Sequence, residues 1–117
     1  MCGIAGYTHP REVDREVLTR MTACLATRGP DAQGEFATSD EVFLGHRHLS
    51  IQDLTSRASQ PMGNDDHSVH LTYNGECYNH RELRDLMPGR SFYSTGDTET
   101  ILRLYEKFGE EFILKVI

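Results

Sequence analysis

The residue with the clearest capacity for chemistry is Cys2, which follows Met1. Removal of Met1 would place a thiol and a free α-amine on one residue. Unperturbed pKa values are about 7.7–8.0 for such an amine and about 8.5 for the thiol, so the neutral amine can act as general base near neutral pH. The alternative is that Cys2 is a small apolar packing residue, because most free cysteines are inert. The sequence therefore makes Cys2 a candidate nucleophile that depends on removal of Met1.

Several further motifs follow Cys2 along the chain. They are Arg28-Gly29-Pro30-Asp31, the segment from Leu44 to Asp53, Gln60-Pro61-Met62, the segment from Tyr73 to Leu83, and Gly96-Asp97-Thr98-Glu99. In this order and spacing they resemble the glutaminase domain of class II glutamine amidotransferases, and the asparagine synthetase branch matches best. The resemblance covers residues 2 to 108, which is nearly the whole chain.

The resemblance implies an N-terminal-nucleophile glutaminase that needs no cofactor. Cys2 would attack the side-chain amide of glutamine and form a glutamyl thioester, which water hydrolyses. The products are glutamate and ammonia, the latter for transfer to an acceptor such as aspartate. The Asn74 side chain and the Gly75 backbone N–H would stabilise the oxyanion, where each donor is worth about 10²–10³ in rate. Taken alone, Asn74-Gly75 is more typical of a turn after a strand, and the motif around it favours the oxyanion role.

The resemblance also assigns residues that bind the substrate. Glu76 and Asp97 would hold the glutamine ammonium group, and Asp97 can also cap a helix. The family usually has an arginine, which grips the α-carboxylate, where this chain has His48. An imidazole cannot copy the two-pronged contact of a guanidinium, although a protonated His48 can make a weaker one. Arg47 is no obvious substitute, because neighbouring residues on a strand point to opposite faces.

A metal site is an alternative interpretation for Cys2, His46 and His48. His46 and His48 are two residues apart on a predicted strand and so face the same way, and Cys2 is expected nearby. No further ligand set with suitable spacing supports a metal, so the sequence predicts none. His46 is instead expected to be structural, and Cys77 to be a packing residue.

The composition is typical of a small soluble domain. The chain has 117 residues and a net charge of −6. This negative charge does not favour binding to nucleic acid or to an anionic membrane. No apolar run approaches the roughly 20 residues needed to span a bilayer, and no signal peptide is evident. The three cysteines, an odd number, favour a reducing compartment, so we expect a cytoplasmic protein.

Hydrophobic periodicity predicts an α+β fold with antiparallel sheets flanked by helices, and the resemblance implies that the sheets stack. The expected strands are residues 3–8, 35–38, 41–46 and 69–73. We expect the first strand to be buried, and the strands 35–38 and 41–46 to pair through a turn at 39–40.

The expected helices are residues 11–27, 80–87, a segment capped by Asp97 or Thr98 and ending at Phe108, and 110–117. The apolar faces of the first and third helices are Val13, Val17, Leu18, Met21, Cys24 and Leu25, and Ile101, Leu102, Tyr105 and Phe108. Residues 52–67 are expected to form a surface loop.

The family's glutaminase domain continues with more strands than this sequence contains, and an ATP-dependent synthetase domain follows it in full-length relatives. Residues 1–117 are therefore expected to be a partial glutaminase domain without its synthetase domain. An incomplete sheet leaves an open edge, which favours a homo-oligomer. The alternative function is a catalytically silent domain that serves binding or assembly.

Overall fold

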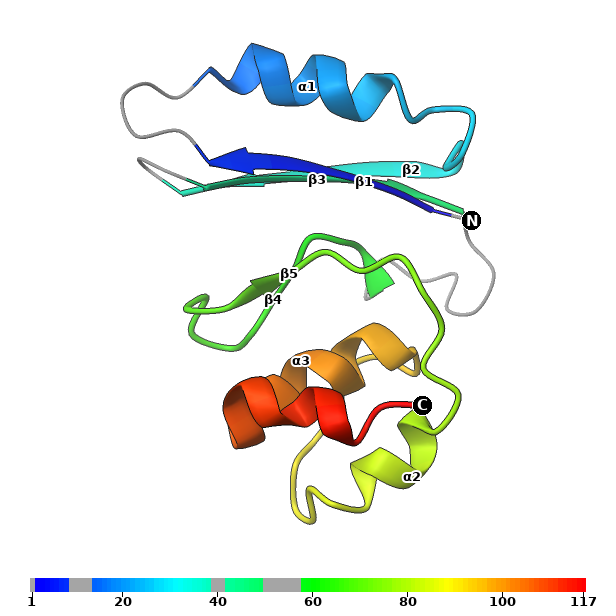
Figure 1. Ribbon diagram of the computed structural model, residues 1–117, viewed down its shortest axis with the longest axis vertical. Coiled ribbons are helices and arrows are strands. Elements are labelled where there is room, and N and C mark those ends of the chain that lie inside the picture. Colours follow the sequence, from blue (N-terminus) through cyan, green and yellow to red (C-terminus); the bar gives the residue numbers. More distant parts are fainter. Residues whose placement is uncertain (1, 9–13, 39–41, 50–57) are drawn as a thin grey trace. The chain divides into compact units, whose positions relative to one another are not determined.

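The computed structural model describes residues 2–8, 14–38, 42–49 and 58–117 (Figure 1). The expected turn at 39–40, the start of the first helix and residues 52–57 of the expected loop lie outside these ranges. The chain forms two compact units, which are described separately below. The first comprises Met1–Ile51, Ser59–Pro61 and Thr72–Asn74, and the second comprises Gln52–Ala58, Met62–Leu71 and Gly75–Ile117.

The first unit contains a three-stranded antiparallel sheet in the order β1-β3-β2, formed by Gly3–Thr8 (β1), Ala32–Ala37 (β2) and Val42–His48 (β3). Gly3 pairs with Arg47 on one side of β3, and Ala32 pairs with His48 on the other. The predicted first strand and the predicted hairpin are thus confirmed. The expectation that residues 3–8 are buried was wrong. Burial alternates along β1, because it is an edge strand of the described sheet, covered by the helix on one face.

Helix α1 (Arg15–Ala23) covers one face of this sheet (Figure 1). Its N-terminus is capped by Asp14, whose Oδ1 accepts the backbone N–H groups of Glu16 and Val17 at 3.0 and 3.3 Å. The helix is shorter than predicted, because the chain leaves it in a turn where the Leu25 carbonyl accepts the N–H of Gly29. Cys24 is consequently exposed rather than part of the apolar face.

The helix packs closely on the central strand because β3 contains a glycine at the contact. Leu18, Thr22 and Phe43 are buried here, with at most 1% of each side chain exposed. A Cβ atom at Gly45 would fall 2.2 Å from Oγ1 of Thr22, which is far inside contact distance. Glycine at this position therefore sets the distance between α1 and the sheet.

The second unit begins with a small antiparallel hairpin of strands β4 (Met62–Gly63) and β5 (His70–Leu71). The predicted surface loop over 52–67 was therefore partly wrong, because it contains β4 and the buried Met62 and Asn64. Asn64 can be buried because its side chain is hydrogen-bonded. Its Oδ1 accepts the N–H of Val69 at 2.9 Å, and this bond closes the hairpin. The predicted strand over 69–73 is reduced to two residues.

Helices complete the second unit: α2 (His80–Arg84), α3 (Asp97–Phe108) and the 3₁₀ helix η2 (Gly109–Leu114). The central helix α3 packs on the hairpin, on α2 and on η2. Its N-cap is Gly96 and has no side-chain cap bond, so the prediction of Asp97 or Thr98 as the cap was wrong. Ile101, Leu102 and Leu104 form its buried face, whereas Tyr105 is 40% exposed.

The chain is therefore α+β, with antiparallel sheets and flanking helices, as the sequence predicted. Within the described residues, the helices are too short and too polar to cross a membrane.

Candidate active site

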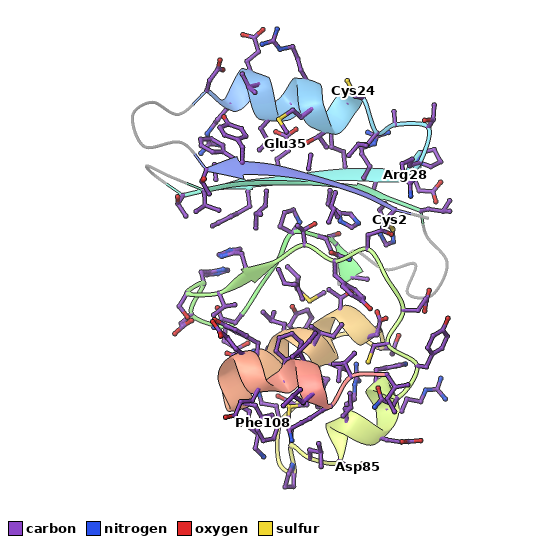
Figure 2. The ribbon with its side chains drawn as sticks, viewed as in Figure 1. Cys2, Cys24, Arg28, Glu35, Asp85 and Phe108 are labelled. Atoms are coloured by element: carbon purple, nitrogen blue, oxygen red, sulfur yellow. The ribbon has the colours of Figure 1, made fainter. Side chains whose placement is uncertain are left out.

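Cys2 lies immediately before β1, at the same end of the first unit as Arg28 (Figure 2). The Arg28 side chain donates from Nε to the Cys2 carbonyl at 3.3 Å. Next along the chain, Gly3 is packed so closely against Leu25 that an added Cβ would lie 2.9 Å from the Cβ of Leu25. These contacts fix the backbone on both sides of the Cys2 side chain, which is partly buried.

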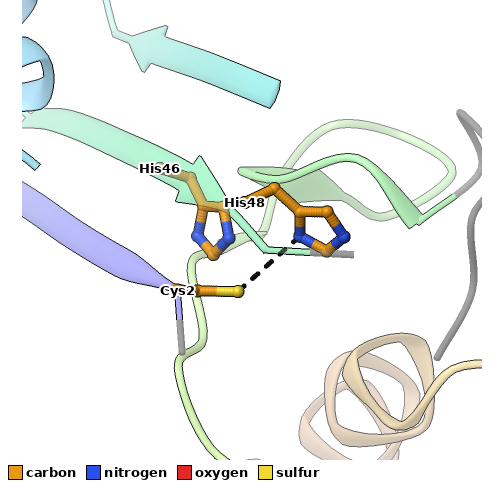
Figure 3. A group of neighbouring side chains, drawn as sticks. All are labelled: Cys2, His46 and His48. Atoms are coloured by element: carbon orange, nitrogen blue, oxygen red, sulfur yellow. Dashed lines mark hydrogen bonds between the residues drawn. The ribbon is translucent and has the colours of Figure 1, made fainter. Parts of the chain in front are cut away.

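The thiol of Cys2 faces the end of β3. Extending the register by one residue beyond the Gly3–Arg47 pair places Cys2 opposite His48. The Cys2 Sγ lies 3.7 Å from Nδ1 of His48 (Figure 3). It also accepts the backbone N–H of Leu49 at 3.4 Å. The sulfur therefore has an imidazole nitrogen and a backbone N–H donor beside it.

His46 lies on the same face of β3 and is 1% exposed. Its Nδ1 is 3.0 Å from Oγ1 of Thr72, whereas its Nε2 is buried with no hydrogen-bond partner. Burial, and secondarily the nearby His48, lowers the pKa of His46 from 6.5 to about 4. The ring is therefore neutral at neutral pH. This contact with Thr72 could not be predicted from local sequence patterns, because the two residues are distant in the chain.

Arg47 projects from the other face of β3, as strand alternation requires. Its Nε donates to the Gly29 carbonyl at 2.8 Å, and its Nη1 donates to Oε1 of Gln33, also at 2.8 Å. The guanidinium thus supports the turn before β2. This position agrees with the expectation that Arg47 does not replace the family's arginine.

The structure divides the predicted oxyanion and ammonium-binding residues between the two units. Asn74 ends the last segment of the first unit, and Gly75 and Glu76 begin the last segment of the second. All three are exposed. Just before Asn74, the Tyr73 N–H donates to Oε1 of the buried Gln60 at 2.6 Å, which anchors this segment to the first unit.

Asp97 is the first residue of α3 and is 8% exposed. Its Oδ2 accepts the backbone N–H of Cys77 at 2.8 Å, so the residue after Glu76 is bound directly to Asp97. Burial, and then the Asp97 charge, raises the pKa of the Cys77 thiol. Cys77 is 2% exposed and is a packing residue, as predicted.

The predicted site residues thus form two groups. Cys2 and His48 meet in the first unit, with His46 beside them. In the second unit, Glu76 precedes Cys77, whose backbone N–H donates to Asp97. The catalytic and substrate-binding roles of these residues remain predictions.

Comparison with known proteins decides the family. The family model described as a glutamine amidotransferase domain matches residues 1–117. The chain belongs to this family. Asparagine synthetase [glutamine-hydrolyzing] 2 of Oryza sativa is 40% identical over 116 residues, which cover 97% of this chain and 19% of the relative. Nodule asparagine synthetase of Pisum sativum is 38% identical over 116 residues, covering 97% of this chain and 20% of the relative. This glutamine amidotransferase domain therefore spans about a fifth of the length of these relatives.

Proposed function

We propose that this domain hydrolyses the side-chain amide of glutamine through Cys2, releasing glutamate and ammonia. The observation that carries the proposal is the position of the Cys2 sulfur, between Nδ1 of His48 at 3.7 Å and the N–H of Leu49 at 3.4 Å, in a chain of the glutamine amidotransferase family. Because the sulfur is only partly buried, a small substrate can approach it.

In the proposed reaction, the α-amine of Cys2 takes the thiol proton after Met1 has been removed. The thiolate attacks the amide carbon, and a carbon–sulfur bond forms as the carbonyl becomes an oxyanion. When the oxyanion collapses, the carbon–nitrogen bond breaks and the ammonium group returns its proton to the leaving ammonia. Water then attacks the thioester, which yields glutamate and restores the thiol.

The other predicted residues have the following roles in this proposal. The Asn74 side chain and the Gly75 N–H stabilise the oxyanion, and their exposed position at the end of the Tyr73 segment leaves them accessible. Glu76 and Asp97 bind the substrate ammonium group, and His48 meets the α-carboxylate. The hydrogen bond from the Cys77 N–H to Asp97 supports this grouping, because it holds the residue that follows Glu76 against the Asp97 carboxylate.

We further propose that the ammonia passes to an ATP-dependent synthetase part. The relatives are named asparagine synthetases, and the chain matches only about a fifth of each. Aspartate is then the expected acceptor. All three cysteines are free thiols, which suits a reducing compartment such as the cytoplasm.

The test combines intact mass spectrometry with glutamine turnover and labelling by a glutamine-mimicking diazoketone. We expect loss of one methionine mass, release of glutamate, and labelling of Cys2 that a Cys2→Ser variant abolishes. Cys24→Ser is the matched control, because Cys24 is an exposed free thiol at the C-terminal end of α1. Equal labelling of all three cysteines, or processed protein without turnover, would favour the silent binding module instead.

A further inference from the structure

We propose that Cys2, His46 and His48 form a binding site for a divalent transition metal of the zinc class. One ligand atom from each of these side chains lies within 4.8 Å of the others (Figure 3). The sequence alone predicted no metal, because it offered no further ligand set with suitable spacing beside Cys2, His46 and His48. The structure adds the position of the sulfur and the surroundings of both rings.

The separation between ligand atoms fits such an ion. A tetrahedral zinc with Zn–S near 2.3 Å and Zn–N near 2.0–2.1 Å holds its sulfur and nitrogen ligands about 3.6 Å apart. The distance from Cys2 Sγ to His48 Nδ1 is 3.7 Å. The limit of 4.8 Å for the whole group means that binding needs at most a small closing movement of side chains.

The backbone explains why the three side chains converge. His46 and His48 share one face of β3 because strand side chains alternate. Cys2 is directly opposite His48 when the antiparallel register is extended by one residue. The His46 and His48 ring centroids are 5.8 Å apart, so the rings are adjacent without stacking face to face.

His46 provides a second, independent indication of a ligand. Its Nε2 is buried and has no hydrogen-bond partner, although an unsatisfied buried polar atom usually costs about 1–3 kcal/mol. On the other side of the ring, Nδ1 is 3.0 Å from the Thr72 hydroxyl. If Nδ1 donates to this hydroxyl, the Nε2 lone pair is left for a metal. Metal-binding histidines typically have this arrangement, with the second ring nitrogen held by an outer hydrogen bond.

The donor set selects the class of metal. One thiolate and two imidazoles are typical of zinc and neighbouring transition ions, whereas magnesium and calcium prefer oxygen ligands. Three protein ligands leave a position open for water. Binding would displace the thiol proton of Cys2 to solvent and occupy the sulfur. A bound metal would therefore block Cys2 as a nucleophile, and the metal would act as an inhibitor of the proposed glutaminase.

The experiment titrates Co²⁺, a spectroscopic substitute for zinc, into the 117-residue chain under reducing conditions. We expect one Co²⁺ per chain, a near-ultraviolet band from sulfur-to-cobalt charge transfer, and loss of that band when Zn²⁺ is added. Cys2→Ser should abolish the band, and His48→Arg should abolish stoichiometric binding. Thr72→Val should weaken binding by about 10–100-fold, as loss of an outer hydrogen bond to a metal ligand does.

Cys24→Ser and His70→Gln are the matched controls, because they remove a thiol and an imidazole elsewhere in the chain. Both should bind Co²⁺ like the unchanged chain. A cobalt complex without the sulfur band, or a band that survives Cys2→Ser, would overturn the proposal. Circular dichroism checks that each variant is folded, and His48→Arg carries the test if Cys2→Ser is not. Since the metal itself is the readout, the result is independent of whether the domain hydrolyses glutamine.

Discussion

The carboxylate of Asp97 accepts the backbone N–H of Cys77, with 2.8 Å between Oδ2 and the nitrogen. This bond joins the start of α3 to the segment that carries Gly75 and Glu76. Both partners are buried, at 8% and 2% exposed. Asp97 therefore has a structural role that is separate from its proposed role in binding the substrate ammonium group.

Two substitutions separate these roles. Asp97→Ala leaves the buried Cys77 N–H without an acceptor, so we expect a loss of about 1–3 kcal/mol in the free energy of unfolding by urea. Asp97→Asn keeps an acceptor oxygen and should retain most of the stability. It removes the negative charge, so we expect the KM for glutamine to rise about tenfold or more. An Asp97→Asn variant with an unchanged KM would remove Asp97 from the substrate site.

Close packing of α1 on β3 gives a second prediction. A methyl group at Gly45 would lie 2.2 Å from Oγ1 of Thr22, a hydroxyl that is buried without a partner. Gly45→Ala should therefore lower the free energy of unfolding by about 1–3 kcal/mol through overpacking. Thr22→Ala alone should cost little, and in the double variant it should recover part of the loss. Equal losses in the single and double variants would show that the Thr22 hydroxyl is not the obstacle.

Hydrophobic patterns in the sequence predicted several of the strands and helices. The short apolar run over residues 3–8, the two paired strands predicted at 35–38 and 41–46, and the apolar spacing of α3 all correspond to observed elements. What the sequence missed depends on distant partners. Glu99 is fully buried because its carboxylate accepts the backbone N–H groups of Tyr93 and Ser94. The residues around Glu99 in the sequence do not predict these hydrogen bonds.

The candidate site likewise has features that the sequence predicted and features that only the fold reveals. The type and order of its residues were evident from the sequence, and strand alternation predicted that His46 and His48 share a face. The distance between Cys2 and His48 follows from register, which periodicity alone does not fix. The contact of His46 with Thr72 joins residues 26 positions apart and required the fold.

His48 supports a prediction about substrate affinity. Replacing it by arginine should restore a two-pronged contact with the glutamine α-carboxylate. We expect His48→Arg to lower KM about tenfold while kcat stays nearly constant, the pattern of uniform binding. His70→Arg adds the same charge in the second unit and should leave KM unchanged. An unaltered KM, or loss of turnover, in His48→Arg would show that this position does not bind the carboxylate.

The ion-pair cluster of the second unit predicts an acid-sensitive fold. Asp65 pairs with Nη2 of the buried Arg103 at 2.6 Å and with Nη2 of Arg90 at 3.1 Å. The hydrogen bond from Arg103 is the main reason that the pKa of Asp65 lies below its ordinary value of 3.8. The unfolded chain therefore takes up this proton at a higher pH than the folded chain does.

It follows that the contribution of Asp65 to stability is fully present above pH 3.8 and is lost as the pH falls through its lowered pKa. Asp65→Asn should flatten the dependence of the unfolding free energy on pH in this acidic range. Asp85→Asn, at the exposed end of α2, is the control and should leave the slope unchanged (Figure 2). Identical slopes in the Asp65→Asn and unchanged proteins would contradict the assignment.

Finally, we predict that the 117-residue chain self-associates. Strands β1 and β2 are the edges of the described three-stranded sheet, and the β1 edge carries Ile4, which is 47% exposed. Unpaired strand edges with apolar side chains favour pairing between copies. Sedimentation equilibrium over a wide concentration range should show a dimer or a larger assembly. Ile4→Lys should weaken it, because a lysine on an edge strand opposes pairing. Leu86→Lys is the control, since Leu86 is similarly exposed, at 44%, but belongs to the second unit and to no strand. A monomer at every concentration would show that the described sheet edges are not sites of association.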